Sequence, residues 1–101
     1  MEDEVDYQII KQPSSGVIKM LENRSNMKDF VKQGSFDTIG LVQGKLVEML
    51  VAADIAEKTA DVNVMEVKGV CPQHFTMITI FGDTAAVTEA VERIKEHFEK
   101  G

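Results

Sequence analysis

The spacing of apolar residues between positions 38 and 98 constrains this chain more than any other feature of its sequence. A short apolar run at 38–42 predicts a strand, and the segment after it has apolar residues at helical spacing to about Thr59. Two further runs, 62–67 and 75–81, are rich in β-branched and aromatic residues and predict strands. A second helix is expected after the run 75–81 and extends to about Lys100. This order favours an α/β (α+β) sandwich, in which helices cover one face of an antiparallel or mixed sheet.

The first of these helices has an unusually wide apolar band. Gln43 and Gly44 are expected to turn the chain from the strand into this helix. Apolar residues then follow at helical spacing, with others beside them: Leu46, Val47, Leu50, Val51, Ala53, Ile55 and Ala60. A band of this width predicts packing on more than one side.

The last helix is expected to have one buried face. Asp83 and Thr84 are both suitable N-cap residues for it. Its apolar residues lie at helical spacing: Val87, Ala90, Val91, Ile94 and Phe98. The acidic residues and His97 between them are expected to form a solvated surface.

The N-terminal third predicts one more strand and a short helix. Val5, Tyr7 and Ile9 alternate in a strand pattern with one buried face. Ser14 and Ser15 are both able to cap a short helix that runs to about residue 23. The segment 24–37 has little periodicity and is expected to be a linker, with a turn of helix at 27–31. Because 101 residues suit one core, we expect a single domain over 1–101, with the segments 1–23, 24–37 and 38–101.

Composition excludes several classes of protein. A net charge of −6 disfavours a nucleic-acid partner, because binding requires neutralised phosphates. No stretch approaches the roughly 20 apolar residues that span a bilayer, and the acidic start Met1–Val5 does not resemble a secretory signal. The chain is therefore expected in the cytoplasm. The sequence has no nucleophile–base pairing, carboxylate dyad, phosphate-binding glycine loop or metal motif, so we do not expect an enzyme.

Two stretches of the sequence resemble the shell domain of bacterial microcompartments (the BMC domain). The first contains Ala52-Ala53-Asp54 and Lys58-Thr-Ala-Asp-Val62, and the second contains Gly82-Asp83 followed by Thr84-Ala-Ala-Val-Thr-Glu-Ala90. The similarity covers residues 38–100. It implies a structural protein of the microcompartment shell, within the cytoplasm, that forms homohexameric tiles with other shell proteins around encapsulated enzymes.

The N-terminal segment also resembles part of that family. Tyr7–Pro13 and the short helix after it resemble the strand, proline-containing turn and helix that follow the last helix in most members. The resemblance implies a circularly permuted shell domain, with the linker joining the old end to the old beginning. Such a permutation is physically easy where chain termini lie close together.

The resemblance also assigns a pore loop, which in the family lies between the second and third strands and carries small residues. Here it consists of Lys68, Gly69, Val70, Cys71, Pro72, Gln73 and His74. This sequence looks closest to the shell protein of glycyl-radical propanediol-utilisation microcompartments, which holds an iron–sulfur cluster at a pore cysteine. The resemblance implies a cluster, [4Fe–4S] in type, that the hexamer shares through Cys71.

The chemistry of the loop allows that cluster only in an assembly. Iron–sulfur clusters typically take four thiolates, whereas each chain has the single cysteine Cys71. Gly69 permits a tight bend and Pro72 stiffens the loop. His74 is either an auxiliary ligand or proton carrier, or an ordinary loop residue. Electron transfer across the shell, cluster delivery and oxygen sensing are all roles that such a cluster would serve.

Several alternatives stay open. A lone cysteine is often only a small packed residue, which would leave a plain metabolite pore without a cluster. A small oligomeric α/β regulatory module that binds a ligand between subunits is the other reading. Lys58 aligns with the lysine that the family places at the hexamer edge, or is a solvated helix charge. The family's arginine in the proline-containing turn is Gln12 here.

Overall fold

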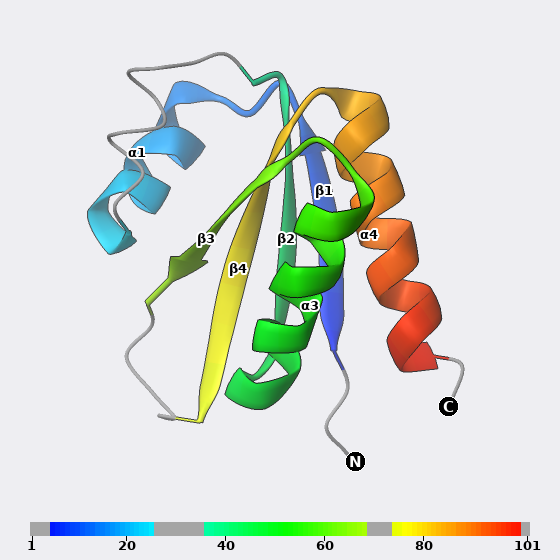
Figure 1. Ribbon diagram of the computed structural model, residues 1–101. Helices are drawn as coiled ribbons and strands as arrows, with labels where there is room; N and C mark the ends of the chain where they lie inside the picture. Colours follow the sequence, from blue (N-terminus) through cyan, green and yellow to red (C-terminus); the bar gives the residue numbers. More distant parts are fainter. Residues whose placement is uncertain (1–4, 26–35, 69–73, 100–101) are drawn as a thin grey trace.

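The computed structural model describes residues 5–25, 36–68 and 74–99. Its elements confirm the predicted order, with a strand and a helix before the strand, helix, strand, strand and helix (Figure 1). They are β1 (Asp6–Lys11), α1 (Ser15–Arg24), β2 (Thr38–Lys45), α3 (Leu46–Thr59), β3 (Asn63–Val67), β4 (Phe75–Gly82) and α4 (Thr84–Glu99). The turn of helix expected at 27–31 lies outside the described residues.

The four strands form one antiparallel sheet in the order β1-β2-β4-β3. β2 and β4 pair along their whole length, from Thr38 opposite Gly82 to Lys45 opposite Phe75. The N-terminal strand β1 adds to the free edge of β2, with Ile9 opposite Gly40. The structure thus confirms the α+β fold and decides between the antiparallel and the mixed sheet.

α3 and α4 cover one face of the sheet and enclose the larger core (Figure 1). Val87, Ala90, Val91 and Ile94 are buried along α4, as their spacing predicted, and Phe98 packs against the edge of this core. The other buried members of this core are Val42, Met49, Ala52, Ala56, Ile78 and Ile80.

α1 packs against the opposite face of the sheet, so the prediction that helices cover only one face is wrong. Its Leu21 is 7% exposed and joins Ile39, Val67 and Phe81 in a second buried cluster. Alternate residues of a strand point to opposite faces, so both faces of this sheet carry apolar side chains and both need a cover. The short apolar helix after β1 supplies the second cover.

The predicted turn between β2 and α3 is also wrong. Gln43 and Gly44 continue β2 and pair with β4. The Lys45 backbone N–H donates to Glu48 Oε1 at 3.1 Å, and α3 begins at the next residue. Because this carboxylate satisfies a backbone donor at the helix end, the strand passes into the helix without a separate turn.

The buried side of α3 follows the expected band only in part: Ala53, Ile55 and Ala60 pack against the core. Met49, Ala52 and Ala56 face the sheet and are at most 1% exposed. The larger residues of the band, Leu46, Val47, Leu50 and Val51, point outward and are 39–66% exposed. α3 packs against the sheet and against α4, and its alanines let it approach them closely.

Two residues were predicted as possible caps for each of the helices α1 and α4, and in each case the structure confirms the first of the two. Ser14 Oγ accepts a hydrogen bond from Val17 N at 3.4 Å at the start of α1. Asp83 Oδ1 accepts one from Ala86 N at 2.8 Å at the start of α4. Each cap satisfies a backbone N–H that the helix itself leaves unpaired.

Candidate functional site

The loop between β3 and β4 is the predicted pore loop, and the structure describes its two ends. Lys68 follows directly after β3, and His74 directly precedes β4. The residues between them, Gly69, Val70, Cys71, Pro72 and Gln73, lie outside the described residues.

Backbone hydrogen bonds hold both ends of this loop to helix termini. Lys68 N donates to the Arg24 carbonyl at the end of α1, at 3.0 Å. Leu46 N, at the start of α3, donates to the His74 carbonyl at 2.7 Å. The last carbonyls and first N–H groups of a helix have no partner within it, so the loop ends satisfy groups that would otherwise need water. Two helices on opposite faces of the sheet therefore fix the entrance and the exit of the loop.

His74 is exposed at the exit of the loop. Its ring meets that of Phe75 edge to face, with the centroids 5.3 Å apart. Within the part of the chain that the structure describes, no three His, Cys, Asp or Glu side chains gather into a set able to hold a metal ion. The proposed role of His74 as an auxiliary ligand stays a prediction.

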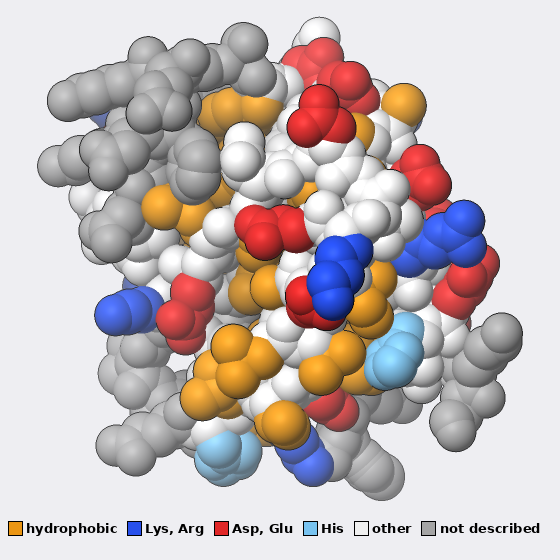
Figure 2. Space-filling model, viewed as in Figure 1, with side chains coloured by type: hydrophobic (Ala, Val, Ile, Leu, Met, Phe, Trp, Pro, Cys, Tyr) orange, Lys and Arg blue, Asp and Glu red, His pale blue; other side chains and the backbone are white. Residues whose placement is uncertain are grey.

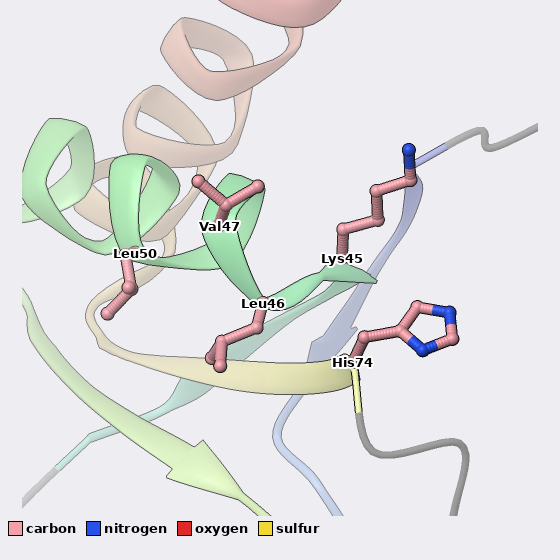
Figure 3. A pocket seen from close by; sticks show the side chains of 5 residues that line it. All are labelled: Lys45, Leu46, Val47, Leu50 and His74. Carbon is pink, nitrogen blue, oxygen red and sulfur yellow. The ribbon is translucent and has the colours of Figure 1, made fainter.

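An open depression lies beside the loop exit. Lys45, Leu46, Val47, Leu50 and His74 line it, and its volume is about 360 Å³ (Figure 3). Lys45 and His74 extend from the point where β2 passes into α3 and where β4 begins, and Leu46 and Leu50 project from the same helix (Figure 3). The loop exit and the start of α3 therefore form one continuous surface.

The exposed apolar residues of α3 make this surface unusual for an isolated chain. Leu46, Val47, Leu50 and Val51, here called the α3 patch, are 41%, 66%, 64% and 39% exposed. Figure 2 shows hydrophobic side chains gathered over the N-terminal half of α3. Contiguous exposed apolar patches commonly mark protein interaction sites. The sequence predicted that α3 packs on more than one side but did not show which of its residues stay exposed in the single chain.

Lys58 lies in the last turn of α3, at the opposite end of this helix from the loop. Its Nζ is 3.0 Å from Asp54 Oδ2, one helical turn earlier, and its side chain is 76% exposed. An exposed pair of this kind contributes little to folding.

Gln12, after β1, adopts a left-handed backbone with φ of 49°, and its N–H donates to the Asp37 carbonyl at 2.6 Å. The structure thus places neither Lys58 nor Gln12 at the β3–β4 loop.

The start of β1 lies beside the end of α4. Lys95 Nζ is 5.7 Å from the centroid of the Tyr7 ring. Burial raises the pKa of Tyr7, and the negative charges of Glu99 and Glu48 raise it further. No described residue forms a hydrogen bond with the buried Tyr7 hydroxyl. The alternation of Val5, Tyr7 and Ile9 showed that Tyr7 faces a core, but not which helix meets it.

Comparison with known proteins identifies the family of this chain. The family model described as BMC domain matches residues 38–101, which is more than half of the sequence. The chain belongs to the BMC domain family. This BMC-domain chain is a structural shell protein of a microcompartment. Within residues 5–25, 36–68 and 74–99, no helix combines the length and apolar character needed to cross a membrane.

Solved structures of similar chains agree with that assignment. The ligand-free GrpU microcompartment shell protein from Clostridiales bacterium 1_7_47FAA is 35% identical with a TM-score of 0.71, over 93% of this chain and 92% of that one. The GrpU shell protein from Pectobacterium wasabiae is 30% identical with a TM-score of 0.72, over 89% and 99%. The CutR flat hexamer, 23% identical over 98% of this chain and 81% of that one, shares the fold with a TM-score of 0.68. No curated protein sequence matches the chain.

Proposed function

We propose that this BMC-domain chain forms a homohexameric shell tile in which six β3–β4 loops surround a central pore. The observation that carries this proposal is the position of the α3 patch, which adjoins His74 at the loop exit. A neighbouring copy packed on this patch would cover Leu46, Val47 and Leu50 and lie next to the loop. Assembly would thereby bury the apolar residues that the single chain leaves in water.

We further propose that Cys71 thiolates of several copies hold an iron–sulfur cluster at this pore. One chain supplies one thiolate, whereas a cluster typically takes four, so the donor set fits only where copies meet on the sixfold axis. Six sulfurs exceed the number of ligands required, so the ring binds asymmetrically or leaves a ligand position open. When bound, the cluster supplies one-electron redox chemistry, with electron transfer across the shell as its use. The sequence resemblance to the shell protein of glycyl-radical propanediol-utilisation microcompartments supports this cofactor.

The edge of the tile is a further part of the proposal. Lys58 is exposed at the end of α3 that lies away from the loop. At that position it would meet other hexamers and other shell proteins. Its exposed pair with Asp54 is weak enough to exchange for such a contact.

We also propose that the domain is circularly permuted. The family model matches residues 38–101, while β1 from the N-terminal segment completes the same sheet at the edge of β2. Tyr7 at the start of β1 lies against Lys95 near the end of α4. In the unpermuted order the end of α4 would continue directly into β1 at this junction, which is the closeness of chain ends that a permutation requires.

Anaerobic purification tests the tile and the cluster together. The native chain and Cys71→Ser are compared by solution mass and visible absorption. We expect a coloured hexamer from the native chain and a colourless hexamer from Cys71→Ser. A colourless native hexamer would leave a plain metabolite pore, and a dimer or trimer would favour the oligomeric regulatory module instead.

A further inference from the structure

α1 depends on packing for its stability. It has ten residues, which is shorter than an isolated helix needs to be stable in water. Leu21 is its one buried residue, and Val17 and Ile18 pack around the same cluster. The position of α1 on the sheet is therefore set mainly by contacts to Ile39, Val67 and Phe81.

The same cluster contains the residue that precedes the loop. Val67, 3% exposed, ends β3, and Lys68 N donates to the Arg24 carbonyl at 3.0 Å. The Ser25 hydroxyl donates to the Leu21 carbonyl at 2.7 Å and closes the last turn of α1. Side-chain packing and a backbone hydrogen bond therefore join the end of α1 to the first residue of the loop.

We propose that α1 is a positioning element for the entrance of the β3–β4 loop, at Val67 and Lys68. Leu21 seats the helix on the sheet, and the Arg24 carbonyl fixes the direction in which the chain leaves β3. Cys71 follows Lys68 by three residues in the sequence, so the reactivity of its thiol is a chemical reporter for this entrance. The packing of α1 on the far face of the sheet thereby holds Val67 and Lys68, the residues at which the chain leaves β3. This inference rests on the proposed function only in treating this loop as the pore loop.

Hydrogen exchange and thiol alkylation test this coupling on the full chain, reduced and without iron. Leu21→Ala removes the seat of α1, and Ser25→Ala loosens its last turn. Val91→Ala is the matched control, because it opens a cavity in the other core. The readouts are exchange of the Lys68 amide and alkylation of Cys71, which is the chain's single cysteine.

We expect Leu21→Ala to speed exchange at the Lys68 amide at least about tenfold and alkylation of Cys71 at least about threefold, because the local opening requires less free energy. Ser25→Ala should act in the same direction, and it decides the question if Leu21→Ala does not fold. Val91→Ala should leave both rates close to native. Unchanged rates in the α1 variants, or equal changes in the control, would overturn the proposal. The solution mass of the same samples is measured separately. A native chain that is not hexameric would contradict the proposed tile, but the exchange and alkylation rates would still test the role of α1.

Discussion

At Gly40 a hydrogen atom stands where every other residue would carry a β carbon. A β carbon there would lie 2.9 Å from Val91 Cγ2 and 3.1 Å from Val87 Cγ1. Both valines are buried on α4, so they cannot move into solvent. The approach of α4 to β2 thus depends on this one glycine.

Gly40→Ala is therefore expected to lower the free energy of unfolding by about 1–3 kcal/mol, as overpacking in a core does. Urea unfolding at a fixed chain concentration measures it. Gly16→Ala is the control, because the nearest atom to its added β carbon is Ser14 Oγ at 4.0 Å. That change should raise the stability by a few tenths to about 1 kcal/mol through helix propensity. Equal effects of the two substitutions would contradict the packing argument.

Tyr7 gives the fold a dependence on alkaline pH. Burial, with the charges of Glu99 and Glu48, raises its pKa above the ordinary value of 10.0. The unfolded chain therefore loses this proton at lower pH than the folded chain. The stability that this difference contributes is fully present below pH 10.0 and is lost as the pH rises through the folded pKa.

We expect native stability to fall more steeply above pH 10.0 than that of Tyr7→Phe. At neutral pH the substitution should change stability little, because no described residue pairs with the Tyr7 hydroxyl. Urea unfolding over an alkaline series tests both statements. Tyr7 is the single tyrosine, so its absorbance titration reports the pKa directly, and titration at or below 10.0 would refute the argument.

At the scale of the element, α3 has two apolar sides, one buried and one exposed. Met49, Ala52 and Ala56 hold it on the sheet, whereas the α3 patch contributes little to the folding of one chain. Substitution in the patch should therefore separate assembly from folding.

Leu50→Glu is expected to reduce the proposed hexamer to smaller species, because a carboxylate would be buried without a partner between subunits. Met20→Glu on α1 is the matched control, since Met20 and Leu50 are both 64% exposed. Native mass and far-ultraviolet circular dichroism follow the two variants. We expect helical signal in both and an intact hexamer only in Met20→Glu. An intact hexamer in Leu50→Glu would exclude the α3 patch as the subunit interface.

At the scale of the whole molecule, the first strand and the last helix are neighbours. β1 and α4 lie at opposite ends of the sequence, yet they meet at Tyr7 and Lys95. A chain that starts at Phe36, runs to Gly101, continues from Met1 and ends at Ser25 would keep every described element whole.

This rearranged chain is expected to fold into the same assembly, with a melting temperature within a few degrees of native. A second rearrangement, opened between Lys45 and Leu46, is the control. It breaks the chain where Glu48 caps α3, so it should be less stable by about 1 kcal/mol or more. Circular dichroism and native mass compare the two. Failure of the first chain to fold would count against the proposed permutation.

Local spacing in the sequence determined much of this structure. Strand and helix periods fixed the element order, the buried face of α4 and the caps at Ser14 and Asp83, because each depends on neighbours within a few residues. The motifs around Ala52–Asp54 and Gly82–Asp83 also indicated the BMC family, which the family model confirmed. The ends of the candidate loop, Lys68 and His74, followed from the strand boundaries, while the role of Cys71 stays a prediction.

Only the tertiary structure decided which face α1 covers, which side of α3 is buried and what holds the loop. Leu21 has the same sequence neighbours whichever face of the sheet it meets. The apolar residues of α3 lie on several sides of the helix, so their spacing does not specify which side is buried. The bond from Lys68 to Arg24 joins residues far apart in the chain, and no local pattern specifies it. The sequence by itself determined the elements and the family, because those follow from local periods and motifs. The arrangement around the loop required the packed chain, because contacts between distant residues produce it.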